Sequence, residues 1–291
     1  MALAEPPAQT AHPIVRLHDG QWHDAGDVLA VEEPLEIRLL WEEDGQERRE
    51  SIAITMRTPG DDFALAAGFL HAEGIIAGRE DVLDISYCLD EIEPQEQRLN
   101  IVTVRLRPEL AFELDRLQRH FYTTSSCGVC GKAALEALDL QGCRPLPDGP
   151  QVRAEVIQSL PETLSRAQAV FRATGGLHAA GLFDLEGRLL DLREDVGRHN
   201  ALDKLAGAMA REGVAFADGM LLLSSRISVE LVQKAAMVGA TVVVAVSAPT
   251  SLAVRLADDA GITLIGVARA DGFEVLTHPE RIVVHEDQHV A

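Results

Sequence analysis

Apolar and polar residues alternate in two stretches near the start of the chain. Apolar side chains stand at every second position over residues 35–39 and again over 52–56, and Asp44-Gly45 lies between them. A period of two places apolar side chains on one face of a strand, and Asp-Gly is typical of a tight hairpin turn. The pattern therefore predicts a β-hairpin.

The segment after this hairpin mixes helical and strand patterns. Thr58-Pro59-Gly60-Asp61-Asp62 ends the second strand and supplies a start signal for a helix over 63–72, which Gly74 closes. Residues 99–106 alternate as a further strand, and 108–117 carry a helical apolar stripe. We therefore expect a disordered tail over 1–13 and an N-terminal α+β subdomain over 14–120.

The second half of the chain has a different pattern of apolar residues. A connector with two Gly and three Pro over 142–150 precedes it, so we expect a mobile loop and connector over 121–150. Beyond it, strands that are apolar throughout alternate with helices of about ten residues, which indicates a sheet covered on both faces. The sequence thus predicts an α/β domain over 151–291, with helices over 152–173, 201–211, 229–238 and 251–260 and strands over 179–183, 189–192, 220–224, 241–246 and 263–268.

Charge and composition limit the classes of partner. The 291 residues hold 46 acids against 26 bases, a formal charge of −20, which argues against a surface that binds nucleic acid. No signal peptide pattern is visible near Met1, and the longest apolar runs are too short to span a bilayer. We expect a cytoplasmic protein without membrane contact.

Polar clusters follow three of the predicted strands. In open α/β sheets, ligands bind beyond the carboxyl ends of the strands, and helix starts rich in Ser, Thr and Arg suit phosphate oxygens. Each cluster could equally be an ordinary helix cap, but three at successive strand ends favour a ligand. The clusters are Ser224-Ser225-Arg226-Ile227-Ser228, Ser247-Ala248-Pro249-Thr250-Ser251 and Arg269 with Asp271-Gly272.

A dense charged segment spans 191–204. Seven of its fourteen residues are Asp, Glu, Arg or Lys, as a solvated charge run would also show. Gly197 and Asn200 stand among these charges and could bring backbone and amide donors to a planar or phosphorylated ligand. We therefore keep Arg198, His199, Asn200 and Lys204 as candidate ligand contacts.

Two cysteines lie on a glycine-flanked loop ahead of a helical run. Cys127 and Cys130 have a Lys two residues after the second thiol, and both the cation and the helix start would favour thiolate. Structural zinc lacks a second close ligand pair, whereas His71-Ala72-Glu73 matches half of the zinc deaminase signature. A redox pair and a persulfide-forming sulfur carrier are the other interpretations.

Several motifs, taken together, resemble the FdhD/NarQ family of formate dehydrogenase accessory sulfurtransferases. The likeness runs in the expected order from about residue 14 to 285, and this number of matches is specific although each match alone is weak. The matching segments are residues 57–60, 68–70, 73–76, 126–132, 195–204, 247–250 and 277–281.

The resemblance implies a sulfurtransferase that serves formate dehydrogenase. It would accept sulfur from a cysteine desulfurase as a persulfide on Cys127, with Cys130 assisting or resolving, and pass it to the molybdenum cofactor, Mo-bis(molybdopterin guanine dinucleotide). It also implies a homodimer and a cytidine-deaminase-like three-layer α/β fold for the larger domain. From the spacing of the cysteines and histidines we expect no structural metal. The cofactor segment would be Val267, Ala268, Arg269, Ala270, Asp271 and Gly272.

Basic residues would then form a pocket for the polyanionic cofactor within an acidic protein. Two departures from the family's usual residues, Ser225 in place of Gly and Val267 in place of Phe, touch this pocket and not the thiols. A cofactor chaperone without catalysis and a zinc deaminase stay as alternatives. The expected cofactor contacts outside 267–272 are Arg198, His199, Asn200, Lys204, Arg226 and Thr250.

Overall fold

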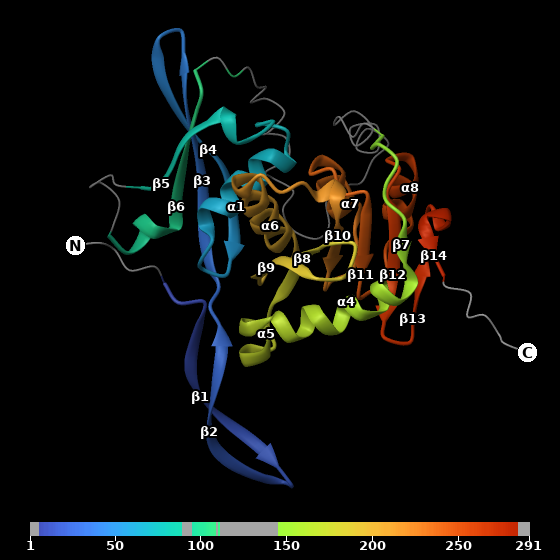
Figure 1. Cartoon of the computed structure of the whole chain (residues 1–291). Helices are drawn as coiled ribbons and strands as arrows, with labels where there is room; N and C mark the ends of the chain where they lie inside the picture. The colour runs from blue at the N-terminus through green and yellow to red at the C-terminus, as the bar shows by residue number, and fades with distance from the viewer. Residues whose placement is uncertain (1–5, 89–94, 109, 111–144, 285–291) are drawn as a thin grey trace, which may run out of the picture.

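The computed structural model has three parts, an N-terminal two-stranded ribbon, a four-stranded unit and a larger domain with a six-stranded sheet (Figure 1). It describes residues 6–88, 95–108, 110 and 145–284. Cys127, Cys130 and most of the helix predicted over 108–117 lie outside these residues. Among the described residues, no helix has the length and apolar character needed to cross a membrane.

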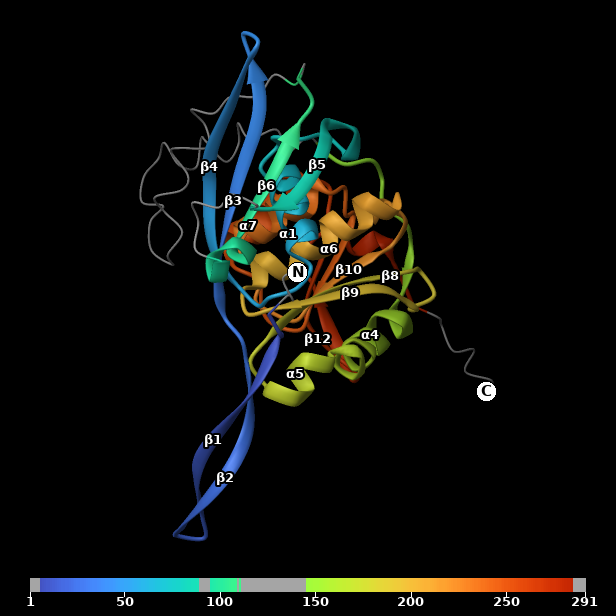
Figure 2. The same cartoon turned by 90° about the vertical axis from the view of Figure 1, so that its left-hand side faces the viewer.

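The ribbon consists of β1 (Gln9–His18) and β2 (Gln21–Ala30), which pair antiparallel and extend away from the body (Figure 2). The tail predicted over 1–13 therefore overlaps a strand from Gln9 onward. Because paired residues project from the same face, Leu17 and its partner Trp22 stand together, and they are 55% and 70% exposed. The sequence did not predict this ribbon.

The four-stranded unit contains the hairpin that the alternating pattern predicts. Asp44 and Gly45 join its two strands with φ of 53° and 73°, the left-handed pair that a two-residue hairpin turn requires. The strand order is β4-β3-β6-β5, and the buried face packs on a helix. Its elements are β3 (Glu33–Glu43), β4 (Gln46–Arg57), α1 (Asp62–Ala72), β5 (Val82–Tyr87) and β6 (Ile101–Leu106), with single-turn helices at Arg79–Asp81 and Gln95–Asn100.

The larger domain is built on a sheet of order β13-β12-β11-β10-β8-β9. Strands β10, β11 and β12 run parallel, as crossover helices between them require, and the other three strands are antiparallel to their neighbours. Its strands are β8 (His178–Phe183), β9 (Leu189–Asp195), β10 (Met220–Leu223), β11 (Val242–Ala245), β12 (Thr263–Arg269) and β13 (Gly272–Val275). A small parallel pair joins β7 (Val152–Arg153) and β14 (Ile282–Val283).

Helices cover both faces of this sheet. The helices α6 (Arg198–Glu212), α7 (Val229–Met237) and α8 (Ser251–Asp259) share one apolar core with it, and α4 (Ala154–Ala167) shares another. Each fully buried Leu or Ile in these cores contributes about 1.5–3 kcal/mol relative to an exposed position. The mixed α/β class predicted from the sequence is thus confirmed.

One predicted helix is interrupted. The sequence predicts a single helix over 152–173, whereas the structure has α4 and a short α5 (Ala169–Thr174), separated at Gln168. Gln168 has a ψ of 89°, which is not helical. The break turns α5 toward the base of the ribbon, where α5 contacts β2.

A close helix crossing joins the two sheet-containing units. A Cβ added at Gly68 of α1 would lie 1.9 Å from the Asp203 carbonyl oxygen of α6, and one added at Gly207 would lie 2.0 Å from the Ala64 carbonyl oxygen. Only glycine fits at both positions because the backbones themselves are in contact. The crossing therefore sets the position of α6 relative to the four-stranded unit.

Candidate functional site

The carboxyl edge of the six-stranded sheet gathers residues from five strands. The parallel strands β10, β11 and β12 end there, β8 begins there, and β9 ends there. Pairing places His178 opposite Asp195, and the Ser224 hydroxyl accepts a hydrogen bond from the Ala179 amide at 2.8 Å. The edge therefore unites the charged segment with the strand-end clusters that the sequence indicated.

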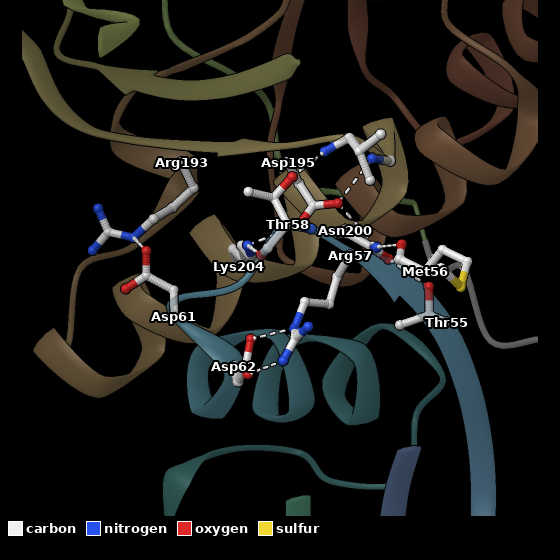
Figure 3. A network of polar contacts seen from close by, with 12 residues as sticks. Thr55, Met56, Arg57, Thr58, Asp61, Asp62, Arg193, Asp195, Asn200 and Lys204 are labelled. Carbon is white, nitrogen blue, oxygen red and sulfur yellow. Dashed lines mark hydrogen bonds and ion pairs between the residues drawn. The ribbon is translucent and has the colours of Figure 1, made fainter. Parts of the chain in front are cut away.

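A buried network fixes the turn between β9 and α6. The Asp195 carboxylate accepts hydrogen bonds from the backbone amides of Gly197 at 2.8 Å and Thr58 at 3.1 Å, and lies 2.7 Å from Lys204 Nζ. Figure 3 shows Asp195 at the end of β9, Lys204 of α6 and Thr58, the residue after β4, lying together. This network holds the start of α6 against the four-stranded unit.

Two of the predicted ligand contacts are used inside this network. Lys204 is 2% exposed, and its ammonium donates to the Thr58 carbonyl at 2.7 Å as well as pairing with Asp195. Asn200, 7% exposed, donates to the Met56 carbonyl at 2.7 Å and accepts from the Thr55 hydroxyl at 3.1 Å (Figure 3). Because their polar groups are occupied within the protein, we leave both out of the cofactor site.

Beside this network lies a second buried pair, fully enclosed. Arg57 is 0% exposed and binds the Asp62 carboxylate through two nitrogens, at 3.0 and 2.8 Å (Figure 3). Such fork-on-carboxylate geometry is the strongest form of side-chain ion pair. It ties the end of β4 to the first residue of α1.

At the start of α6, by contrast with these paired groups, some buried polar atoms have no hydrogen-bond partner in the described chain. The Nε of Arg198 and the Nε2 of His199 are buried without a hydrogen-bond partner among the described residues. The Ser228 hydroxyl, which precedes α7, lies beside the Glu230 carboxylate and donates a hydrogen bond to it. Buried polar atoms are normally paired, and although His71, Asp191, Arg193 and Thr241 also retain one such atom each, only at the start of α6 do two consecutive described residues do so, which favours a ligand there.

Burial sets the charge state of the histidines at this edge. It lowers the pKa of His199 to about 4, and the positive charges of Arg198 and Lys234 act in the same direction while Glu230 opposes them. Burial also lowers the pKa of His178, with a further contribution from Arg198 that Asp195 opposes. Both rings are therefore neutral at pH 7, each with one donor and one acceptor nitrogen.

The remaining predicted residues lie along the same edge. Arg226 is exposed after β10, and Thr250 caps α8 by accepting a hydrogen bond from the Ala253 amide at 3.3 Å. Arg269 donates to the carbonyl oxygens of Val246 and Ala268, so its guanidinium lies over the end of β11.

The segment 267–272 forms a bulged hairpin between β12 and β13. Val267 has a φ of 53°, a left-handed conformation that is an outlier for a β-branched residue. The pairing register shifts between Gly266 and Arg269, and Ala270 and Asp271 form an exposed turn before Gly272 begins β13. Backbone strain of this kind concentrates at functional sites.

His71 and Glu73, which match half of the zinc deaminase signature, both take part in packing between helices. The His71 Nε2 lies 3.2 Å from the Met237 carbonyl, and Glu73 lies 3.8 Å from Lys234 Nζ. Lys234 also binds Asp203 at 2.8 and 2.9 Å, and burial raises the pKa of Asp203 to about 6 against that attraction. Within the described ranges, no group of three or more His, Cys, Asp or Glu side chains could hold a metal ion.

Comparison with known proteins identifies the family. The model of the FdhD/NarQ family matches residues 30–283. The chain belongs to the FdhD/NarQ family.

Relatives from bacteria and archaea cover nearly the whole chain of this family member. It is 46% identical over 274 residues to a protein of Streptomyces coelicolor named sulfur carrier protein FdhD, covering 93% of this chain and 94% of the relative. A protein of the same name from Mycobacterium tuberculosis is 47% identical over 279 residues, with 94% and 98% covered. One from Sulfolobus acidocaldarius is 42% identical over 270 residues, with 92% and 96% covered.

A solved structure supports the same placement. It is described as that of a formate dehydrogenase accessory protein from Desulfotalea psychrophila, and its TM-score to this chain is 0.73 at 26% identity. The match covers 95% of this chain and all of the other. The family and the overall fold are therefore established together.

Sequence reasoning included Ser228 in the polar cluster after the strand over 220–224 but did not single out Glu230. Both belong to the start of α7. Burial acts to raise the pKa of Glu230, but the hydrogen bond with the Ser228 hydroxyl, and then the charges of His199 and Arg198, outweigh it, so the pKa is lowered. The signal that could have found Glu230 is the Ser228-Val229-Glu230 start of this helix, which begins five residues after Leu223, the end of a buried strand, and two after Arg226.

Proposed function

We propose that this protein carries sulfur for formate dehydrogenase maturation as a persulfide on Cys127. Cysteine desulfurase would supply the sulfur, and Mo-bis(molybdopterin guanine dinucleotide) would receive it as the protein's cargo. The observation that carries the cofactor part is the pair of unpartnered buried atoms of Arg198 and His199 at the start of α6, on the sheet edge. Membership of a family whose relatives are named sulfur carrier proteins supports the sulfur part.

The loading step is a thiol exchange without net oxidation. The Cys127 thiolate attacks the outer sulfur of the donor persulfide, the donor's S–S bond breaks, and the donor cysteine leaves as a thiolate. If Cys130 then attacks the inner sulfur, a Cys127–Cys130 disulfide forms and sulfide leaves, the two thiols having supplied its two electrons. This is the resolving role expected for Cys130.

The residues of the sheet edge would bind and orient the cargo. The Arg198 guanidinium and the starts of α6 and α7 supply positive charge and donors for phosphate oxygens. Arg226 and Arg269 lie at the ends of β10 and β12 and extend this positive edge. We expect a homodimer to act in the reaction, as the family resemblance implies.

Intact-protein mass spectrometry tests the sulfur step. After incubation with a cysteine desulfurase and cysteine, we expect a gain of about 32 Da per sulfur that reductant reverses. Cys127→Ala should abolish the gain. Cys88→Ala is the matched control, because Cys88 is a buried free thiol, and it should load like the wild type. Loading that persists in Cys127→Ala would exclude Cys127 as the carrier.

A further inference from the structure

The two strands of the ribbon carry an apolar face along their length. Alternate residues of β1 project from one face, and their pairing partners on β2 project from the same face. Within these two described strands, Asp24 is the one charged side chain on this face, whereas Arg16, Asp27 and the histidines project from the opposite face. The ribbon face consists of the apolar side chains of Ala11, Pro13, Val15, Leu17, Trp22 and Val28.

The ribbon face is exposed to solvent. Val15, Leu17 and Trp22 are 60%, 55% and 70% exposed. A two-stranded ribbon is only marginally stable in water by itself, and contiguous exposed apolar surface marks a site of interaction. The ribbon nevertheless extends away from the body with ten residues in each strand (Figure 2). Its apolar face therefore needs a covering surface that the described part of this chain does not supply.

A second exposed apolar surface lies on the four-stranded unit. The core of this unit packs on one face of its sheet, where odd-numbered residues of β3 such as Leu35 and Ile37 are buried. The even-numbered residues of β3 and their partners on β4 project from the other face, where Ile54 and Met56 are 65% and 47% exposed. The outer patch consists of the apolar side chains of Pro34, Leu40, Ile54 and Met56.

The ribbon and the β3–β4 hairpin are arranged so that two copies of the chain can cover each other. They extend in opposite directions from the junction at residues 31–32 (Figures 1 and 2). The strands of the ribbon have ten residues and β3 has eleven, which corresponds to a length of about 33–37 Å for each. A two-fold axis that passes near this junction would therefore lay the ribbon of each copy along the outer patch of the other.

The positions on the two sides of the junction are complementary. Trp22 and Leu40 are each nine residues from Val31, so the two-fold axis would bring one to the level of the other. Asp24 and Arg38 are each seven residues from Val31, so the one carboxylate of the ribbon face would lie at the level of a guanidinium. Arg38 binds Glu36 through two nitrogens, and a guanidinium has five N–H donors in all. Apolar positions would thus meet apolar positions, and the acid would meet a base.

The area of the contact favours a second copy over an unrelated protein. One face of the ribbon covers roughly 330 Å², so a contact with one partner surface would bury about 660 Å² in total. Stable interfaces bury about 1,200–2,000 Å². Two identical contacts in a two-fold dimer would bury about 1,300 Å², whereas a single contact with another protein falls below this range.

We propose that the ribbon is a dimerisation arm, whose apolar face packs on the outer patch of a second copy of this chain while that copy's ribbon packs on the outer patch of the first. The inference goes beyond the proposed function, which assigns no surface to the homodimer. It depends neither on the sulfur step nor on the cofactor site.

Sedimentation velocity of the full-length protein over a concentration series tests the arm. The wild type should sediment as a dimer with twice the chain mass of 31.5 kDa. Trp22→Asp and Leu40→Lys each place a charge in both apolar contacts, so each variant should raise the Kd of the dimer by at least about a hundredfold. Circular dichroism spectra identical to that of the wild type would show that both variants are folded.

The matched control is Leu190→Asp. Leu190 is an apolar side chain on β9 of the six-stranded sheet, away from both proposed surfaces, and it is 52% exposed. This variant introduces the same charge at an exposed apolar position and should sediment as a dimer like the wild type.

An equimolar mixture of Trp22→Asp and Leu40→Lys tests whether the two surfaces meet each other. In a mixed dimer, one contact has both surfaces unaltered, and in the other contact the introduced carboxylate faces the introduced ammonium. We therefore expect the mixture to form dimers at concentrations where each variant alone is a monomer.

Three results would overturn the proposal. A wild type that sediments as a 31.5 kDa monomer would leave the ribbon face to a different protein. A Trp22→Asp variant that remains dimeric would place the dimer interface elsewhere, and a mixture that stays monomeric would remove the ribbon from the outer patch. Persulfide formation on Cys127 is measured separately by mass, so the sulfur step of the proposed function stands or fails independently of the arm.

Discussion

The junction between the two units and the carboxyl edge of the sheet are both rich in buried polar groups, but they differ in how these groups are satisfied. At the junction, the head groups of Arg57, Asp195 and Lys204 are all bonded within the protein. At the edge, Arg198 and His199 retain buried atoms without a partner in the described chain. The two regions are only a few residues apart along α6.

This difference separates residues that stabilise the fold from residues that are available to bind a ligand. A satisfied buried network stabilises one arrangement, and removing one member leaves the others unpaired. An orphaned buried atom costs free energy in the absence of a ligand, so a ligand that bonds it gains affinity. We therefore expect substitutions at the junction to change stability, and substitutions at the edge to change binding.

The largest expected effect comes from breaking the junction. Arg57→Leu leaves the Asp62 carboxylate buried without its guanidinium, and should lower the free energy of unfolding by about 3–5 kcal/mol in denaturant titration. Arg105→Leu is the control: Arg105 pairs with Glu47 at 2.9 Å, but the two side chains are 48% and 59% exposed. Its loss should stay below about 1 kcal/mol. Equal losses would refute the role of burial.

The helix crossing should respond nearly as strongly. Gly68→Ala places a methyl group against the α6 backbone, so α1 and α6 must separate, and we expect a loss of about 1–3 kcal/mol in thermal or denaturant unfolding. Gly26→Ala is the control because a Cβ there meets nothing within 4 Å. A Gly68→Ala variant as stable as wild type would show that the crossing can widen freely.

The pH dependence of the free energy of unfolding tests the burial of His199 at the edge of the sheet. Because burial lowers the pKa of His199 to about 4 from 6.5, the unfolded chain binds a proton in this interval that the folded chain does not. The contribution of His199 to the free energy of unfolding should therefore fall by on the order of 1–3 kcal/mol as pH drops from about 6.5 to 4, whereas Asp203, whose pKa burial raises to about 6, contributes in the opposite direction. His199→Gln should flatten this decline, whereas His12→Gln, on the exposed ribbon, should not. If the free energy of unfolding of the wild type and of His199→Gln changed equally with pH, the lowered pKa of His199 would be contradicted.

The smallest stability effect is expected at Arg198. Arg198→Met removes a guanidinium with an unpartnered Nε, so the free energy of unfolding should change by less than about 1 kcal/mol. The Kd for pyrophosphate should nevertheless rise about tenfold in calorimetry. Arg166→Met, at a side chain that is 70% exposed on α4, serves as the charge-matched control. A destabilised Arg198→Met with normal binding would assign Arg198 to the junction instead.

Local signals in the sequence predicted much of the fold. The alternating stretches around Asp44-Gly45 predicted the hairpin, and the apolar runs predicted β10, β11 and β12 with their crossover helices. These elements are specified by residues within about ten positions of one another. The ribbon was missed because its strands carry few strong strand formers, and because their pairing, rather than their composition, defines the apolar face.

The site was predicted less completely because its polar partners are distant in sequence. The interpretation of Asn200 and Lys204 as ligand contacts rested on their neighbours in one segment. Their bonds go to Met56 and Thr58, 144 and 146 residues away, which no spacing within the segment can indicate. By contrast, the edge position of Arg269 followed from its place after a buried strand, and that inference needed only the parallel order of the sheet.

The exposed end of the ribbon gives the protein an optical probe of its own. The chain has two tryptophans: Trp41 packs against the core of the four-stranded unit, and Trp22 is 70% exposed near the turn of the ribbon. Emission from Trp22 would shift to shorter wavelength when another surface covers the ribbon. Trp22→Phe would leave Trp41 as the background, so the surroundings of the ribbon can be followed in solution without attaching a dye.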